Sequence, residues 1–382
     1  MPKFTVIMKI LEVCHFTTGA CGVWARAREE AIRLVECGHE VKIFSSNFVK
    51  GTGEIAPREE TIGKIKITRF PARKLGGESF MNWDFEREAL AYKPDVIVAH
   101  NYRQIPTTKA LKIARKLRAS GRECKVLLVT HAPFVEGNIT RSNLAKLAVT
   151  AYDKLIGPAT INKFDKILTI SKWEIPYLLK LGAKKSKIKY IPNGIPEEFF
   201  KQKKGHTENK ILFLGRISPK KKLDTLIEAA QFIEERDVKI EIVGPPEPEY
   251  SRYLKGLVRK FKVQDKINFL PPIYELKEKI KKLDSAKMYV LPSRVEGMPQ
   301  SLIEAMAREK IVIGSDSIAI RDLIRDNHNG YLFEFNNPRD LARKINLALK
   351  GNKEIAKNAK KSVEDFSWPK VIEKINKEII SA

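Results

Sequence analysis

The 382-residue sequence predicts an α/β protein with two doubly wound parallel-sheet domains that face a cleft. Three observations support this prediction. Short apolar segments recur along the chain, helical patterns separate several of them, and the rhythm starts again after a stretch rich in Pro, Gly and Lys at residues 191–210. Apolar segments without polar alternation are typical of parallel strands that are covered on both faces. The chain also exceeds the length at which a single hydrophobic core usually stops growing.

The first domain is predicted to span residues 1–195. Its strands are expected at MKILEV (8–13), HEVKIF (39–44), KIKITRF (64–70), PDVIVAH (94–100), KVLLVT (125–130) and KILTIS (166–171). Residues 23–37 are expected to form a helix, because Trp24, Ala27 and Ala31 share one face at helical spacing and Gly38 follows as a stop. This alternation of strands and helices predicts a sheet with helices packed on both faces.

The second domain is predicted to span residues 196–365. Its strands are expected at ILFLG (211–215), KIEIVG (239–244), INFLP (267–271), KMYVLPS (287–293) and KIVIGSD (310–316). In sheets of this kind ligands bind beyond the carboxyl ends of the strands, near the first turns of helices. The loops that follow these strands are therefore where functional residues are expected.

The net charge of +25 is concentrated in the first half of the chain. Residues 1–190 hold 34 Lys and Arg against 18 Asp and Glu, whereas residues 191–382 hold 37 against 28. Such a potential attracts an anionic partner, although it also serves solubility. No module that reads nucleic acid is recognisable, so a nucleic-acid partner is not expected.

The sequence offers no sign of a membrane span or a thiolate metal site. No apolar run approaches about 18 residues, and the first residues lack the pattern of a signal peptide. The four cysteines are spaced without a ligand pattern, so no bound metal is expected. A cytoplasmic protein is expected, with peripheral contact at the inner membrane face left open.

A basic segment follows the first strand of the second domain. The sequence GRISPKKKLDTLIEA (215–229) places Gly215, Arg216 and Lys221 between that strand and a helix expected to start near Leu223. Fixed cations in such a loop suit a diphosphate, Arg through its planar fork and Lys as a point charge. The neighbouring Lys220 and Lys222 are interpreted as solvated surface residues.

Glycines follow the first strand of the chain as well. In TTGACGVW (17–24), Gly19 and Gly22 would let backbone N–H groups approach a phosphate closely. Tight turns after strands need glycine anyway, so this pattern by itself indicates little.

The segment EGMPQSLIEAMA (296–307) carries two glutamates eight positions apart. Pro299 is expected in the first turn of a helix, so Glu296 lies in the loop before it and Glu304 inside it. Both carboxylates can then border a pocket in which N–H groups near the helix start face a phosphate, and the candidate residues there are Gly297, Met298, Gln300 and Ser301. Since carboxylates accept hydrogen bonds from sugar hydroxyls, the ligand predicted is a nucleotide-activated sugar.

The order of motifs resembles that of the retaining GT-B glycosyltransferases of family 4 over nearly the whole chain. The matching segments are TTGACG (17–22), VTHAPF (129–134), LTISKWEIPYL (168–178), KIKYIPNGIPEEFF (187–200), ILFLGRISPKKKLDTLIEAA (211–230), EIVGPPEPEY (241–250), VLPSRVEGMPQSLIEAMAREKIVIGSD (290–316) and NGYLFEFNNPRDLA (329–342). The resemblance implies a GT-B fold, with the donor in the second domain and the acceptor mainly in the first. It also implies that residues 366–382 form a helix that crosses back to the first domain.

The resemblance assigns roles to individual residues. Glu304 would hold ribose hydroxyls, Glu296 the donor sugar, and Arg216 with Lys221 the diphosphate, while His131 would lie near the donor sugar and the acceptor. The chain departs from the family pattern in several places: GACG replaces the usual Gly-Gly pair, Lys222 stands where glycine normally follows the lysine, REKIVI replaces the common Gly-Lys-Pro, and Asp322 stands where glutamate is frequent.

The function predicted is transfer of a hexosyl group, with retention, from a nucleotide-diphosphate sugar to a hydroxyl of a sugar, glycan or lipid-linked acceptor. No Asp-x-Asp occurs in the sequence, so a metal-independent enzyme without a cofactor is expected. Two alternatives remain open, a GT-B sugar-nucleotide epimerase and a basic nucleic-acid-binding protein. The basic amphipathic segments 109–118 and 141–155 leave a membrane-surface contact open as well.

Overall fold

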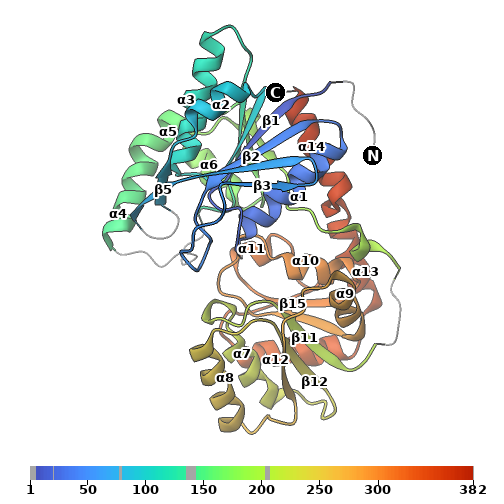
Figure 1. Ribbon diagram of the computed structural model, residues 1–382. Helices are drawn as coiled ribbons and strands as arrows, with labels where there is room; N and C mark the ends of the chain where they lie inside the picture. The colour runs from blue at the N-terminus through green and yellow to red at the C-terminus, as the bar shows by residue number, and fades with distance from the viewer. Residues whose placement is uncertain (1–5, 20, 77–79, 135–142, 203–206, 382) are drawn as a thin grey trace. The chain divides into compact units, whose positions relative to one another are not determined.

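The computed structural model describes residues 6–19, 21–76, 80–134, 143–202 and 207–381, and it divides the chain into two compact units (Figure 1). Of the described residues, the first unit holds those up to Gly194 together with the C-terminal segment from Pro369. The second unit holds Ile195–Trp368.

The sheet of the first unit has the strand order β10-β9-β8-β7-β1-β2-β4-β3. Every pairing in it is parallel except that between β3 and β4. Its strands are β1 (Lys9–Val13), β2 (Glu40–Ser46), β3 (Glu59–Ile62), β4 (Ile65–Phe70), β7 (Val96–His100), β8 (Lys125–Val129), β9 (Lys166–Thr169) and β10 (Ile188–Tyr190). A separate antiparallel pair is formed by β5 (Ala72–Gly76) and β6 (Phe80–Trp83).

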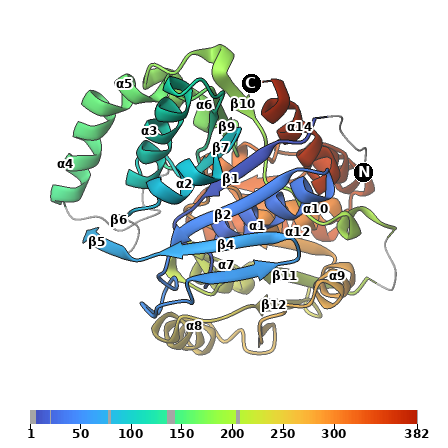
Figure 2. The same ribbon diagram turned by 45° about the horizontal axis from the view of Figure 1, so that its top comes forward.

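Helices cover both faces of this sheet, with α1 and α3 on opposite sides of it in Figure 2. The helical segments are α1 (Gly22–Glu36), α2 (Glu86–Tyr92), α3 (Ile105–Ala119), α4 (Asn143–Ala151), the π-helical η1 (Tyr152–Ile156), α5 (Gly157–Ile161), α6 (Glu174–Lys180), η2 (Lys185–Lys187) and α14 (Trp368–Ser381). The C-terminal helix α14 is tied to this unit by a hydrogen bond of 2.6 Å between Asn376 Oδ1 and His39 Nε2.

The sheet of the second unit has the order β13-β12-β11-β14-β15-β16, with parallel pairing between all neighbours. Its strands are β11 (Lys210–Leu214), β12 (Lys239–Val243), β13 (Ile267–Leu270), β14 (Met288–Leu291), β15 (Ile311–Ser315) and β16 (Tyr331–Phe333). The order reverses between β11 and β14, and this reversal point is where ligands bind in doubly wound sheets.

The helical segments of the second unit lie between and after these strands. They are η3 (Glu197–Phe200), η4 (Pro219–Lys221), α7 (Leu223–Ala229), η5 (Ala230–Phe232), α8 (Pro248–Lys260), α9 (Leu276–Ser285), α10 (Gln300–Ala307), α11 (Ile318–Arg321), α12 (Pro338–Leu349), α13 (Lys353–Val363) and η6 (Glu364–Phe366). In the described part of the chain, no helix is both long enough and apolar enough to cross a membrane.

The structure confirms every strand expected from the sequence and the helix expected at residues 23–37. Five short strands of three to five residues were not expected, namely β3, β5, β6, β10 and β16. Of these, β3 and β5 are largely exposed and β10 is only partly buried, so they lack the apolar runs that predict a strand. One detail was wrong. Pro299 precedes α10 as its N-cap with extended backbone, instead of lying in the first turn.

Candidate active site

The loops after β11 and β14 lie side by side in the second unit. The two strands pair in parallel, with Ile211 opposite Met288, so their carboxyl ends meet at one edge of the sheet. A backbone hydrogen bond of 2.9 Å from the Arg294 N–H to the Lys220 carbonyl oxygen joins the loops directly. Strand order therefore brings together the basic segment and the loop that carries Glu296.

Lys221 and Glu296, both predicted site residues, form an ion pair. Lys221 Nζ lies 2.5 Å from Glu296 Oε1, and both side chains are partly buried, with 21% and 11% of their surface exposed. Lys221 ends the short η4 helix, which fixes its backbone. This lysine is neutralised by a carboxylate that is itself a candidate for holding a sugar.

Arg216 is exposed, and within the described residues its guanidinium makes no hydrogen bond or ion pair. The preceding Gly215 is in close contact with Gly244 at the end of β12. A Cβ on Gly244, whose φ is +147°, would stand only 1.9 Å from the Gly215 carbonyl oxygen. This glycine lets the end of β12 pack against the start of the basic loop.

The backbone at Lys222 has a conformation that suits the glycine expected there from the resemblance. Lys222 adopts a left-handed conformation with φ of 50° and ψ of 42° as it enters α7. Non-glycine residues adopt this conformation at a disadvantage of about 1 kcal/mol. Its Nζ lies 2.6 Å from Asp224 Oδ2 and its side chain is only 24% exposed, so the interpretation of Lys222 as a solvated surface residue was wrong.

The start of α10 presents the next group of candidates, Gly297, Met298, Gln300 and Ser301. All four are partly buried. The Leu302 and Ile303 N–H groups bond back to the Pro299 carbonyl oxygen, which closes the first turn. Ser301 Oγ lies 2.7 Å from the Tyr289 hydroxyl, so the Ser301 side chain is engaged with β14, and its backbone N–H is the group suited to a ligand.

Glu304 is buried in α10, with 7% of its surface exposed. Burial raises the pKa of its carboxyl, and Lys279 of α9, whose Nζ lies 2.5 Å from Glu304 Oε2, opposes this shift. The carboxylates of Glu296 and Glu304 both raise the pKa of the buried Tyr289 hydroxyl, after the larger effect of burial itself.

In the first unit, the predicted phosphate loop follows β1. Gly19 has φ of +78°, and a Cβ there would stand 2.5 Å from the Lys50 carbonyl oxygen, so a tight approach to residue 50 accounts for this glycine. Gly22 is the first residue of the 15-residue helix α1, and a Cβ there would meet nothing within 4 Å. Between them, residue 20 lies outside the described residues.

His131 follows β8 in a left-handed conformation, with φ of 55°. Its Nε2 lies 2.8 Å from Nδ1 of His100, and Nε2 of His100 lies 2.6 Å from Oε2 of Glu12. The next residue, Ala132, donates its N–H to the buried Glu174 carboxylate at 2.9 Å. Burial raises the pKa of Glu174 to about 7, and hydrogen bonds from Thr130 and from backbone N–H groups oppose the shift.

Two family models together match residues 20–364. The model described as Glycosyl transferases group 1 matches residues 194–364, which contain the basic loop and both glutamates. The model described as Glycosyltransferase Family 4 matches residues 20–199. The chain belongs to the group 1 glycosyltransferases.

Relatives of this glycosyltransferase include an uncharacterized glycosyltransferase of Haemophilus influenzae, 30% identical over 65% of the chain and 68% of the relative. Another is an uncharacterized glycosyltransferase of Methanocaldococcus jannaschii, 31% identical over 57% of the chain and 60% of the relative. Among solved structures, Anabaena HepE in complex with UDP and glucose has a TM-score of 0.71, with 17% identity over 98% of this chain and all of that one. The glycosyltransferase thus has the GT-B fold.

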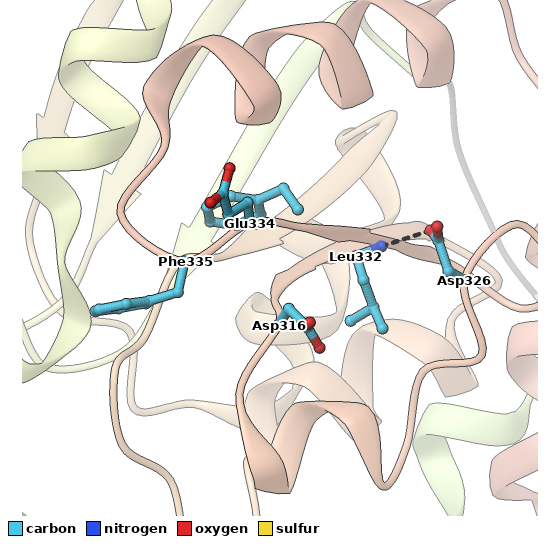
Figure 3. A pocket seen from close by; sticks show the side chains of 6 residues that line it. Asp316, Asp326, Leu332, Glu334 and Phe335 are labelled. Carbon is cyan, nitrogen blue, oxygen red and sulfur yellow. Dashed lines mark hydrogen bonds between the residues drawn. The ribbon is translucent and has the colours of Figure 1, made fainter.

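A pocket of the second unit lies apart from the predicted site of this glycosyltransferase. Figure 3 shows it lined by Asp316, Asp326, Glu334 and apolar neighbours at the ends of β15 and β16. Its carboxylates repel a diphosphate, and two of them are already paired, Asp316 with Arg321 at 2.6 Å and Asp326 with Lys344 at 2.9 Å. This pocket is therefore not a candidate donor site.

Several residues of the site were missed in the sequence. Glu12 and His100 are charged or polar positions within strands that are otherwise apolar, and this exception was the available signal. Lys279 and Tyr289 gave no such signal, because a lysine on an exposed helix and a tyrosine in a strand are ordinary. Within the described ranges, no group of three or more His, Cys, Asp or Glu residues is arranged to hold a metal ion.

Proposed function

We propose that this glycosyltransferase transfers a hexosyl group, with retention of anomeric configuration, from a nucleotide-diphosphate sugar to a hydroxyl group. The proposed acceptor is a sugar, a glycan or a lipid-linked saccharide. The observation that carries the proposal is the joint placement of Arg216, Lys221, Glu296 and the start of α10 at one edge of the second sheet. Support for the donor class comes from the structural neighbour crystallised with UDP and glucose.

The donor would be held by groups of three kinds. The ribose hydroxyls donate hydrogen bonds to Glu304, and the hydroxyls of the donor sugar donate to Glu296. The diphosphate accepts from Arg216, from Lys221 and from the backbone N–H groups of the candidate residues at the start of α10, with the loop at Gly215 supporting the approach. Lys221 must then exchange its contact with Glu296 for a phosphate oxygen, and this exchange frees the carboxylate for the sugar.

The reaction proposed breaks the bond between the anomeric carbon and the phosphate oxygen. Negative charge develops on that oxygen, and the fixed cations stabilise it, so they act mainly in the transition state. The acceptor hydroxyl attacks from the same face, its oxygen bonds to the anomeric carbon, and its proton passes to the departing phosphate. No metal ion is required in this scheme, since Arg216 and Lys221 supply the positive charge. Gly19, Gly22 and His131 of the first unit are proposed to contact the reacting sugar or the acceptor.

Two substitutions separate donor binding from catalysis. Glu304→Ala is expected to weaken binding of UDP, GDP or ADP, whichever the wild type binds, by about tenfold, because it removes a buried acceptor for ribose. Lys221→Ala is expected to lower kcat by about ten- to hundredfold with a smaller effect on donor binding. Calorimetry with each nucleoside diphosphate and steady-state rates with the matching nucleotide sugar provide the measurements.

Lys220→Ala is the matched control, since it removes the same charge from the adjacent position of η4. An equal loss of kcat in both lysine variants would mean that only the overall positive electrostatic potential of the loop matters and that Lys221 has no specific role. Absence of heat with all three nucleoside diphosphates would contradict the donor assignment. The anomeric configuration of the product, read by NMR, decides between retention and inversion, and product formation without an acceptor would favour an epimerase.

A further inference from the structure

Three side chains from adjacent strands form a hydrogen-bonded row in the first unit. Glu12 lies in β1, His100 ends β7 and His131 follows β8, and β7 pairs with both of the other strands. Glu12 Oε2 lies 2.6 Å from His100 Nε2, and His100 Nδ1 lies 2.8 Å from His131 Nε2. The row runs from the centre of the sheet to its carboxyl edge, where ligands are bound in this type of fold.

The inner part of the row is sealed from water, and its outer end is not. Glu12 and His100 have 0% and 1% of their surface exposed, whereas His131 is only partly buried. Within the described residues, Glu12 Oε1 has no hydrogen-bond partner, so His100 is the group that holds this carboxyl. Among the described residues, the remaining ring nitrogen of His131, Nδ1, makes no hydrogen bond and is the free end of the row.

Counting protons along the row links its two ends. Each of the two hydrogen bonds, Glu12 with His100 and His100 with His131, contains one proton. That proton is covalently bound to one of the two atoms that the hydrogen bond joins. If Glu12 is ionised and both rings are neutral, His100 donates from Nε2, His131 donates from its own Nε2, and Nδ1 of His131 is left as a bare acceptor. One further proton, placed on Glu12 Oε2, on His100 or on His131, requires His131 to carry hydrogen on Nδ1.

We propose that Glu12 and His100 are positioning residues that set which ring nitrogen of His131 carries hydrogen, and hence whether His131 donates or accepts a hydrogen bond at the ligand. The inference rests on the proposed function only for the identity of that ligand, a hydroxylated sugar. His131 is the residue that contacts the sugar, and Glu12 and His100 act through it. The hydrogen bond from Ala132 to Glu174 holds the backbone of this segment in place.

The surroundings favour the protonated form of the row at neutral pH. Burial raises the pKa of Glu12 to about 8 and lowers that of His100 to about 4, so the form with every member uncharged is preferred. Arg26 of α1 opposes the shift at Glu12, and Glu30, which lies 2.8 Å from Arg26, offsets part of that positive charge. His131 therefore presents an N–H donor near pH 7.

Two other ionisable groups border the row. Cys14 lies two residues along β1 from Glu12, and burial together with the Glu12 carboxylate raises the pKa of its thiol well above the usual value, so it remains neutral across the relevant range. Glu174 accepts hydrogen bonds from the residues on either side of His131, the Thr130 side chain and the Ala132 N–H. Titration of either group does not change the number of protons within the row.

Nitrogen-15 NMR of the histidine rings in the full-length protein tests the proposal, because protonated and bare ring nitrogens have different shifts. The His131 signal is assigned by its loss in His131→Gln. In the wild type, Nδ1 of His131 is expected to change from protonated to bare as pH rises through about 8, with Nε2 protonated afterwards. A His131 ring that keeps one tautomer between pH 6 and pH 10 would overturn the proposal without any variant.

Glu12→Gln is expected to abolish this change of tautomer, since the amide cannot take up or release the proton. Glu30→Gln is the matched control. It removes a buried carboxyl near the same arginine but outside the row, so the change of tautomer should remain, with its midpoint moved to lower pH by the uncompensated Arg26. A change that persists in Glu12→Gln, or that disappears equally in Glu30→Gln, would contradict the assignment.

Kinetics supply the functional readout. The wild-type kcat/KM is expected to fall above pH 8, because His131 loses its N–H donor. Glu12→Gln should lose this pH dependence. Its affinity for nucleoside diphosphate, a property of the second unit, should stay within about twofold of the wild-type affinity. If no nucleotide sugar is a donor, the proposed function fails but the NMR result still stands or falls by itself. If sugar transfer occurs and kcat/KM depends on pH in the same way in the wild type and in Glu12→Gln, the role of the row in catalysis is refuted.

Discussion

Lys221 and Glu296 illustrate how a single contact sets the state of the site before the donor arrives. Their ion pair is partly exposed, so its contribution is modest, about 0.2–1 kcal/mol. A diphosphate must compete with Glu296 for Lys221. The free energy of the ion pair therefore reduces the free energy of donor binding by the same amount. The same carboxylate is proposed to hold the donor sugar. Its removal should therefore strengthen the binding of free nucleoside diphosphate and slow the transfer of the sugar.

Glu296→Gln is accordingly expected to bind free nucleoside diphosphate about two- to fivefold more tightly than the wild type, while transfer of the sugar slows. The ratio of affinities follows from the ion-pair energy of up to about 1 kcal/mol. Calorimetry and steady-state kinetics on the same preparation measure both. Glu309→Gln, which breaks the ion pair with Lys360 at 3.2 Å, is a control expected to change neither. Weaker diphosphate binding in Glu296→Gln would show that Glu296 assists rather than competes.

Single residues also show where reasoning from the sequence was limited. The roles expected for Arg216, Lys221, Glu296 and Glu304 depended on motif order. The loops that carry the first three meet at one edge of the sheet, and Glu304 lies in the helix that follows. Glu12 and His100 were not predicted as site residues, because the strands were recognised by their overall apolar character and single polar positions within them were not considered. Their pairing joins positions 88 residues apart, which no local pattern reveals.

At the scale of elements, the ends of β11 and β12 are held together by the approach of Gly215 and Gly244. The Gly215 N–H donates to the Val243 carbonyl oxygen at 3.0 Å, directly before the basic loop. Any side chain at position 244 would push against the Gly215 carbonyl oxygen. The geometry of the proposed diphosphate loop thus depends on a residue outside it.

Gly244→Ala is expected to lower the free energy of unfolding by about 1–3 kcal/mol, because the new Cβ forces the backbone apart and its φ is unfavourable for alanine. Urea denaturation measures this change, and nucleotide affinity should fall with it. Gly256→Ala in α8 is the matched control. A Cβ there meets nothing within 4 Å, and the helix gains about 1 kcal/mol from the loss of a glycine. Equal stability of the two variants would contradict the packing argument.

At the scale of the whole molecule, the charge of +25 and an exposed apolar segment point toward an anionic surface. Along α4 and η1, Leu147, Leu155 and Ile156 have 66%, 76% and 47% of their surface exposed, with Lys146 and Lys154 beside them. We propose that this segment contacts the membrane peripherally when the acceptor is lipid-linked. Basic residues near an anionic bilayer contribute about 1 kcal/mol each.

Flotation with vesicles tests this contact. The protein is expected to bind vesicles that contain anionic phosphatidylglycerol, and to bind neutral phosphatidylcholine vesicles several-fold less. Leu155→Asp should reduce the bound fraction by about threefold or more. Leu347→Asp, at a position on α12 of the second unit with 39% of its surface exposed, should not. Equal binding of both variants, or binding that is insensitive to anionic lipid, would refute the proposed surface.

The sequence by itself determined where most of the strands lie along the chain, because continuous apolar runs are local properties. It also determined which loops carry charge, since the basic segment and the two glutamates are contiguous motifs. Only the tertiary structure decided which of these groups meet. Contacts such as Lys221 with Glu296, 75 residues apart, and Glu12 with His100 follow from strand order, and strand order depends on packing across the whole sheet.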